Sequence, residues 1–87
     1  MSSIMNTERT IQRFGEKLRT LRIHQKLTLK ELAQKLGHTA HGYISELENG
    51  KKPPTVETVL GVARLFHVTT DQLLKDELEL EIDDNGR

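Results

Sequence analysis

Cysteine is absent from this 87-residue chain, which excludes a disulfide framework and any thiolate metal site. Aromatic residues are scarce too, because Phe14, Tyr43 and Phe66 are the only ones. The core must therefore come from aliphatic side chains, and a chain of this length is only marginally able to support one alone. We expect one small domain, to which dimerisation would add buried area.

Long apolar runs are absent as well. The longest run is far short of a membrane span, and the N-terminus lacks the apolar stretch of a signal peptide. These two absences predict a soluble, cytoplasmic protein that does not enter a membrane.

Convincing catalytic and metal-ligating groups are also missing. His38 and His41 are close in sequence, but two imidazoles with no thiolate and no carboxylate at ligand spacing do not make a metal site. His41 and Ser45 stand one helical turn apart, without the third orienting group that a base and a nucleophile need. We therefore expect no enzyme, no metal, no cofactor and no small-molecule ligand.

Acidic and basic residues balance in number, but they are segregated along the chain. Residues 1–75 hold 12 Lys and Arg against 7 Asp and Glu, whereas residues 76–87 hold one Arg against 6 acids. The first part is basic and the last part is acidic, so the net charge of zero conceals an asymmetry. A zero sum therefore does not argue against a nucleic-acid partner.

The stretch from 28 to 50 is the most informative part of the chain. Thr28 and Glu31 form an S/T-x-x-E capping box ahead of leucine and alanine at helical spacing, which predicts an amphipathic helix ending at Gly37. A second helix follows a short polar turn and ends at Gly50. Two short helices joined by a tight turn can place the exposed start of the second in the DNA major groove. Sequence-specific reading of DNA is therefore the leading hypothesis.

Three more helices are predicted around this pair. Apolar residues at helical spacing from Thr10 onward predict a first helix that ends near Gln25. Its polar face, which is either functional or only solvated, carries Arg13, Lys17, Arg19 and Arg22. Thr55 is a natural N-cap for a fourth helix, and Thr69 with Gln72 forms a capping box that opens a fifth. Five helices with no convincing strand before residue 76 predict an all-α bundle.

The two ends of the chain are expected to differ from this bundle. Residues 1–9 lack a consistent period and predict a flexible arm before a helix-turn-helix domain over residues 10–75. Residues 76–87 alternate charged and apolar side chains, which suits a strand, although a helix and a solvated tail remain alternatives. Because a helical domain offers a strand nothing to pair with, we hypothesise that it pairs across a dimer. The residues assigned to dimerisation are Leu73, Leu74, Leu78, Leu80 and Ile82.

Four fragments between Phe14 and Leu74 carry a family resemblance through their order and spacing. They are Leu18-Arg19-x-Leu21-Arg22, Leu27-Thr28-x-x-Glu31-Leu32-Ala33, Tyr43-Ile44-Ser45-x-Leu47-Glu48-x-Gly50-x-x-x-Pro54, and Val68-x-x-Asp71-x-Leu73-Leu74. Together they resemble the phage-repressor-like, or XRE-type, helix-turn-helix family. The resemblance implies a five-helix domain that binds a pseudo-palindromic DNA operator as a homodimer and regulates transcription, most often as a repressor.

The resemblance also implies which residues read bases. In that family the start of the third helix and its second turn touch base edges. Carried over by position, these residues are Thr39, Ala40, His41, Gly42, Tyr43 and Glu46. His41 could donate to guanine, Glu46 could accept from cytosine N4, and Ala40 could meet a thymine methyl. Gly42 is expected to keep the helix close to the groove floor.

Other positions carry phosphate-binding or structural roles through the same resemblance. The phosphate contacts it implies are Lys51, Lys52, Lys30 and Ser45. Arg22 and Glu48 occupy positions that form a buried ion pair in family members, which would lock the third helix to the first.

Three positions depart from the family pattern. Leu29 stands where many members have a glutamine that anchors phosphate. The turn at 37–40 is one residue longer than usual, which can shift the register of the base contacts by one. His67 replaces the glycine that usually closes the fourth helix, so it must adopt a positive φ or end the helix differently.

The acidic tail keeps a second function open. An antitoxin-like interaction module would use the tail to mask a partner protein, and would use DNA binding to autoregulate its own promoter. Co-purification of an untagged partner would favour this alternative, whereas a clean homodimer that binds an operator favours the regulator.

Overall fold

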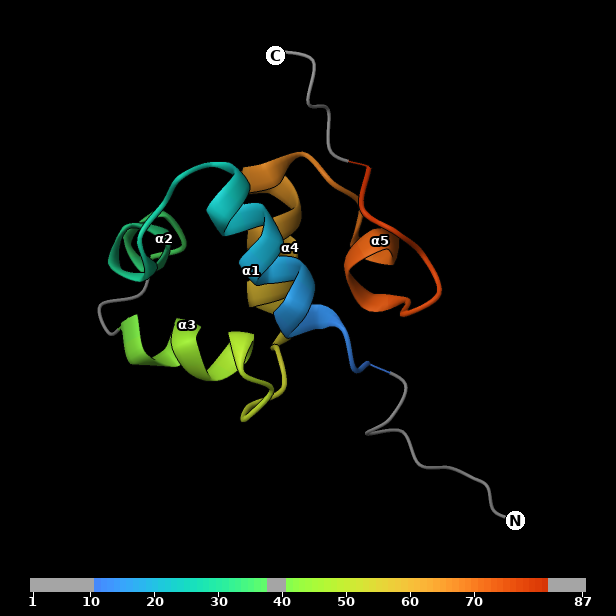
Figure 1. The fold of residues 1–87 in the computed structure, drawn as a ribbon, viewed down its shortest axis with the longest axis horizontal. Helices are drawn as coiled ribbons and strands as arrows, with labels where there is room; N and C mark the ends of the chain where they lie inside the picture. The colour runs from blue at the N-terminus through green and yellow to red at the C-terminus, as the bar shows by residue number, and fades with distance from the viewer. Residues whose placement is uncertain (1–10, 38–40, 82–87) are drawn as a thin grey trace.

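The computed structural model describes residues 11–37 and 41–81. Within these ranges the chain forms α1 (Phe14–His24), α2 (Leu29–Lys35), α3 (His41–Glu48), α4 (Val56–Phe66) and α5 (Thr70–Leu74), and no strand. The predicted all-α, five-helix fold is confirmed. Figure 1 shows α2 and α3 on one side of the molecule and α5 on the other, with α1 and α4 between them. None of these described helices has the length and apolar character needed to cross a membrane.

Threonine caps fix where three of the helices begin. The Thr28 hydroxyl accepts a 3.0 Å hydrogen bond from the Glu31 backbone N–H, and the Glu31 carboxylate accepts one of 2.8 Å from the Thr28 N–H. Thr69 and Gln72 repeat this capping box at α5. Thr55 caps α4 through its hydroxyl. These groups satisfy backbone donors that the first turn of a helix leaves unpaired.

One aliphatic cluster holds the helices together. Its buried members are Phe14, Leu18, Leu21, Leu32, Ala33, Ile44, Leu47, Val59, Val62 and Leu73. α3 packs against both α1 and α2, and α5 packs against α4 and α1. The core therefore supports α3 from its inner side only.

The crossing of α1 and α3 depends on Gly15. A Cβ atom at this position would clash with the Leu47 carbonyl oxygen and would lie 2.7 Å from the carbonyl oxygen of Glu48. Backbone packs directly on backbone here, so the end of α3 is held rigidly against α1.

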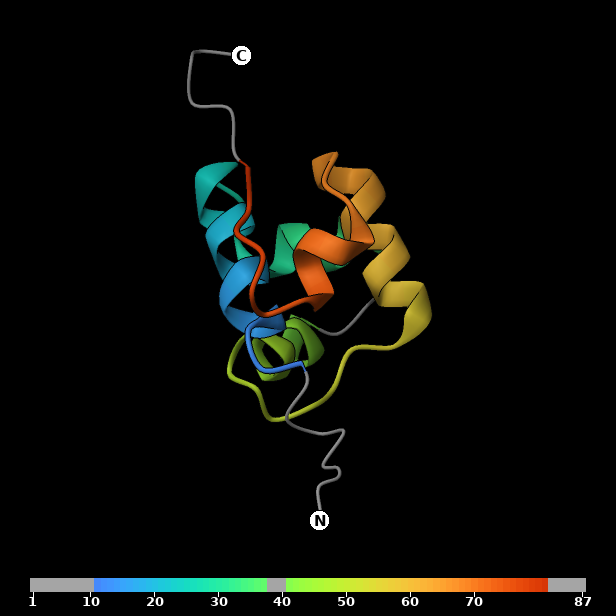
Figure 2. The same ribbon diagram turned by 90° about the vertical axis from the view of Figure 1, so that its right-hand side faces the viewer.

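The C-terminal segment, residues 75–81, contains no strand, which corrects the expectation of one for this part of residues 76–87; residues 82–87 lie outside the described residues. Residues 75–81 form turns and irregular structure that run beside α1 (Figure 2). The Lys17 ammonium donates to the backbone carbonyls of Gln72, Lys75 and Leu78 at 2.6, 2.8 and 2.7 Å. Lys17 is only 1% exposed, so it does not belong to a solvated helix face. The alternation of charged and apolar residues had suggested a strand that pairs across a dimer. The described part of this segment is instead held by α1 of the same chain.

Arg13 and Asp76 fasten the same segment at the start of α1. The Asp76 carboxylate accepts 3.0 Å hydrogen bonds from the backbone N–H groups of Gln12 and Arg13. The Arg13 guanidinium donates to the Asp76 backbone carbonyl and pairs with the Glu79 carboxylate at 3.2 Å. A negative group at a helix N-terminus is favoured by the helix dipole, so Asp76 stabilises α1 from a distant part of the sequence.

The residues assigned to dimerisation do not form one free face. Leu73 is fully buried and Leu80 is half-buried against the core of the same chain, and their assignment to dimerisation stays a prediction. Leu74 is half-buried and Leu78 is 36% exposed. Ile82 lies outside the described residues. The exposed bulky side chains are instead found mainly at Ile11, Ile23, Val56 and Leu60.

Candidate nucleic-acid interface

One face of α3 is open to solvent. Ile44 and Leu47 point into the core, whereas Gly42, Ser45, Glu46 and Asn49 lie on the opposite side at helical spacing. Gly42 and Asn49 are exposed, and the Glu46 side chain is 44% exposed. A Cβ atom added at Gly42 would meet nothing within 4 Å. We call these four residues the outer face of α3.

The predicted base-reading residues are distributed unevenly over this face. Thr39 and Ala40 lie outside the described residues, and His41 is the first residue of α3. Gly42 and Glu46 are on the outer face. Tyr43 is half-buried against the core, and its hydroxyl oxygen lies 3.3 Å from the Thr58 hydroxyl of α4. Tyr43 therefore contacts α4 as well as the core, and its assignment to base reading stays a prediction.

The end of α3 is a Schellman motif. Gly50 has a φ of 75°, its N–H donates to the Leu47 carbonyl at 3.2 Å, and the Lys51 N–H donates to the Glu46 carbonyl at 2.8 Å. The chain turns back over the last turn of α3, which places both Lys51 and Lys52 next to the outer face. Both lysines are exposed, and the Lys52 ammonium lies 3.7 Å from the Glu46 carboxylate.

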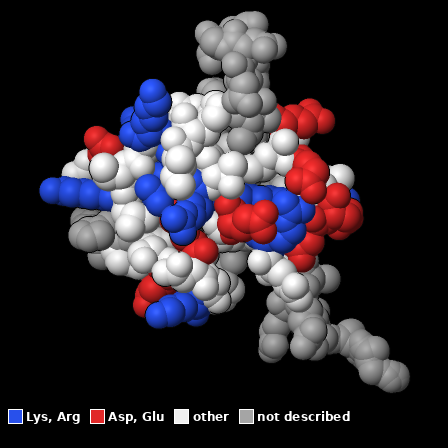
Figure 3. Space-filling view, in the orientation of Figure 1, with Lys and Arg blue, Asp and Glu red and all other residues white. Residues whose placement is uncertain are grey.

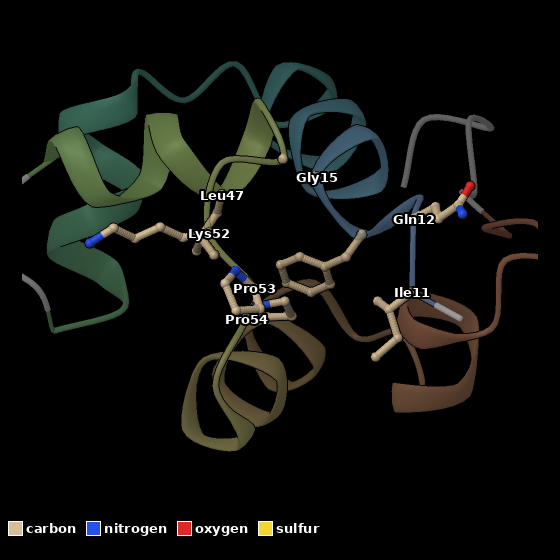
Figure 4. A pocket seen from close by; sticks show the side chains of 9 residues that line it. Ile11, Gln12, Gly15, Leu47, Lys52, Pro53 and Pro54 are labelled. Carbon is tan, nitrogen blue, oxygen red and sulfur yellow. The ribbon is translucent and has the colours of Figure 1, made fainter. Parts of the chain in front are cut away.

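A shallow hollow of about 330 Å³ lies behind this loop. The start of α1, the end of α3 and the 50–54 loop line it, and Figure 4 shows Pro53 and Pro54 as part of its wall. The Lys52 side chain extends along α3, away from the wall formed by Ile11 and Gln12. The Lys52 charge is therefore directed to the side of α3 and not across the hollow.

Arg22 and Glu48 form the expected ion pair between α1 and α3. Arg22 Nε and Nη2 donate to the two Glu48 carboxylate oxygens at 2.7 and 3.1 Å, and Nη1 donates to the Leu27 carbonyl at 2.9 Å. The two side chains are 14% and 5% exposed. Because two parallel hydrogen bonds join Arg22 and Glu48, this ion pair fixes the orientation of α3 relative to α1.

Asn49 is an exposed residue on the outer face of α3 that the sequence analysis did not include among the candidate contacts. It lies seven residues after Gly42, and its side-chain amide donates weakly to the Ser45 hydroxyl at 3.4 Å. The i, i+3, i+7 spacing from Gly42 was the available signal.

Leu29 is half-buried against the core and so cannot anchor phosphate, while Lys30 is exposed on α2.

Charge is distributed asymmetrically over the described surface. Figure 3 shows the largest group of Asp and Glu side chains where the C-terminal segment and α5 lie, with Lys and Arg among them, whereas Lys and Arg outnumber the acids on the side of α1 and α2. No group of three or more His, Asp and Glu residues in the described ranges is arranged to hold a metal. The larger share of basic side chains on the side of α1 and α2 favours an anionic partner on the side away from the C-terminal segment.

Comparison with known proteins gives consistent results. The family described as "Helix-turn-helix" matches residues 18–73. The chain is 39% identical over 64 residues to the HTH-type transcriptional activator BcrR of Enterococcus faecalis, which covers 74% of this chain and 31% of that protein. It is 36% identical over 64 residues to the uncharacterized HTH-type transcriptional regulator YqaE of Bacillus subtilis (strain 168), with 74% and 54% covered. The chain thus spans about a third to a half of these relatives.

Solved structures share the fold. The P22 c2 repressor in complex with a synthetic operator superimposes with a TM-score of 0.69 at 27% identity, covering 76% of this chain and 98% of that one. SinR, the master regulator for biofilm formation, in complex with DNA gives a TM-score of 0.62 at 26% identity, with 69% and 95% covered. The chain belongs to the XRE-type helix-turn-helix family, whose fold is that of DNA-binding transcriptional regulators and not of enzymes.

Proposed function

We propose that this protein regulates transcription by binding double-stranded operator DNA as a homodimer, with α3 in the major groove. The observation that carries the proposal is the outer face of α3, where Gly42 and Asn49 are exposed and the Glu46 side chain is 44% exposed. A helix presented in this way fits the major groove, and its residues can then reach base edges. The P22 c2 repressor and SinR, which share this fold, are both solved in complex with DNA, which supports DNA as the partner.

The contacts fall into two groups. We assign base reading to Glu46 and Asn49, since a carboxylate can accept from cytosine N4 and an amide can pair with adenine. Gly42 lets the helix approach the groove floor closely because it adds no side chain there. We keep Thr39, Ala40 and His41 as proposed base contacts at the start of α3. The proposed phosphate contacts are Lys51, Lys52, Ser45 and Lys30.

A pseudo-palindromic site requires two copies of the domain, and we propose that they meet through an apolar face around α4. Ile11, Val56 and Leu60 are 41%, 76% and 39% exposed, and they surround a hollow of about 350 Å³ that Leu74 also lines. A projecting Val56 beside a hollow can pack into the same hollow of a second copy, as a twofold interface requires. Val56→Asp should reduce both dimerisation, measured by sedimentation, and cooperative operator binding, whereas Ile23→Asp should leave both unchanged.

Repression is the regulatory role that we propose. A dimer bound to an operator can repress transcription by occupying the promoter. A promoter–reporter assay with and without the protein decides the sign, because an activator would raise expression from the same operator. The C-terminal segment is engaged with α1, so the described residues give no support to a tail that masks a partner protein.

Selection from random duplexes tests the proposal as a whole. We expect the parent protein to enrich a two-fold-related sequence with half-sites about 34 Å apart, and binding to weaken as salt rises. Recovery of no preferred sequence, with affinity equal on all duplexes, would rule out sequence-specific regulation by this domain.

A further inference from the structure

We propose that Lys52 is a specificity-determining residue: by holding the Glu46 carboxylate at the outer face of α3, it sets the base preference at the position that Glu46 reads. The inference rests on the proposed function, and it goes beyond a phosphate contact for Lys52. Lys52 belongs to the loop after α3 and not to the recognition helix. It would nevertheless affect which base is preferred, through its contact with Glu46.

The geometry of the loop brings the two side chains together. The Schellman motif returns the Lys51 N–H to the Glu46 carbonyl, so the residue after Lys51 necessarily starts beside the same turn of α3. The Lys52 side chain then runs along α3 (Figure 4), and its ammonium reaches 3.7 Å from Glu46 Oε1. Gly50, with its positive φ, is the residue that makes this return possible.

Electrostatics give the pair a role in the groove. A carboxylate brought into the major groove faces phosphates of the same sign and loses water, and both effects oppose binding. An adjacent ammonium offsets this repulsion and limits the directions that the carboxylate can take. Lys52 therefore lowers the cost of bringing the Glu46 carboxylate into the groove and favours one orientation of it.

The strength of the pair suits a contact that must also face DNA. The side chains of Lys52 and Glu46 are 55% and 44% exposed, and an exposed pair changes an equilibrium by roughly two- to fivefold. Such a pair orients Glu46 in the free protein, and Lys52 can still share its charge with a nearby phosphate in the complex.

Lys51 provides a matched control. It is an exposed lysine in the same loop, one residue away, and within the described residues its ammonium forms no ion pair. Lys51→Met and Lys52→Met remove the same charge from nearly the same place. A difference between them in base preference cannot come from net charge.

The experiment is selection from random duplexes with the parent protein, Lys51→Met, Lys52→Met, Glu46→Gln and the double variant Lys52→Met/Glu46→Gln. Affinities are then measured on the selected site and on the site changed at the base pair that Glu46→Gln ceases to distinguish. We expect Lys51→Met to weaken both duplexes by the same factor. Lys52→Met should also reduce the ratio between them by roughly two- to fivefold. In the Glu46→Gln background, Lys52→Met should leave that ratio unchanged.

Two results would overturn the inference while leaving the proposed function intact. One is a Lys52→Met variant that keeps the parent's ratio and weakens all duplexes as Lys51→Met does. The other is a Glu46→Gln variant that selects the parent's site at every position. Failure of the parent to enrich any sequence is a different result, since it removes the proposed function and the inference with it.

Discussion

The ammonium of Lys17 donates a 2.7 Å hydrogen bond to the backbone carbonyl of Leu78, which joins the first helix to a segment beyond the last one. The same ammonium also binds the carbonyls of Gln72 and Lys75. A fully buried lysine is costly unless its donors are satisfied, and here the backbone satisfies all three. The C-terminal segment is thus part of the folded domain, and its contacts with the start of the chain reach Leu78 and Glu79.

Replacing Lys17 should destabilise the domain. Lys17→Met keeps the length of the side chain but leaves buried carbonyl groups without a donor, so we expect a loss of about 2–3 kcal/mol. Arg19→Met is the control, because Arg19 is exposed on the same helix and its loss should cost less than about 0.5 kcal/mol. Urea unfolding measures both, and equal midpoints for the two variants would mean that the buried ammonium contributes nothing.

Removing Glu48 should be more damaging than removing its neighbour Glu46. Glu48→Ala leaves the half-buried guanidinium of Arg22 without its partner, and the expected loss is about 3–5 kcal/mol. Glu46→Ala removes an exposed acid from the same helix and should cost no more than about 1 kcal/mol. Thermal melts followed by circular dichroism compare the two. A Glu48→Ala protein that melts within about a degree of the parent would show that the pair does not hold α3 in place.

Two glycines should respond in opposite ways to the same substitution. Gly15→Ala forces a methyl group into the carbonyls of Leu47 and Glu48, and we expect a loss of about 1–3 kcal/mol or more. Gly42→Ala meets open space and removes a poor helix former, so it should gain up to about 1 kcal/mol. Unfolding free energies of the two variants test this, and a Gly15→Ala protein as stable as the parent would mean that α1 and α3 can separate at little cost.

The attachment of the C-terminal segment should weaken in acid. Hydrogen bonds from Arg13, and then its charge, lower the pKa of Glu79 below its ordinary value of 4.5. Because the pKa is lowered in the folded protein, the contact contributes its full stability at pH values above the ordinary pKa of 4.5. That stability is lost as the pH falls through the lowered pKa of the folded state. Glu79→Gln removes this dependence, so the parent should lose more stability than the variant on acidification in that range.

NMR titration of the Glu79 side chain measures the pKa directly. We expect a midpoint below 4.5 in the parent and a shift back toward 4.5 in Arg13→Met. A parent midpoint at or above that value would contradict the Arg13–Glu79 contact in solution.

Local signals in the sequence were sufficient for the helices. Both capping boxes, at Thr28 and Thr69, were predictable because each involves residues three apart and depends on no distant part of the chain. Of the two alternatives left open for His67, the structure shows the positive φ, because His67 closes α4 with a φ of 59°. The Arg22–Glu48 pair joins residues far apart in sequence, so it could be expected only from the family resemblance.

Long-range contacts account for what the sequence did not reveal. Lys17 has the spacing of a polar helix face, and only the return of the chain at residues 72–78 buries it. Val56 fits an apolar stripe but is 76% exposed, because it begins α4 and no described element covers it. Tyr43 stands among the predicted base readers by position, and only the fold reveals that its hydroxyl contacts that of Thr58 on α4. These outcomes depend on how helices cross, which local spacing does not determine.

The most direct test of the account is an NMR titration of the labelled protein with its selected duplex. Binding through the outer face of α3 predicts that the largest amide shifts fall at Gly42, Ser45, Glu46, Asn49 and the following lysines, with little change in α5 and the C-terminal segment. Shifts concentrated on α4, α5 or the C-terminal segment, with α3 unaffected, would show that this helix does not read DNA.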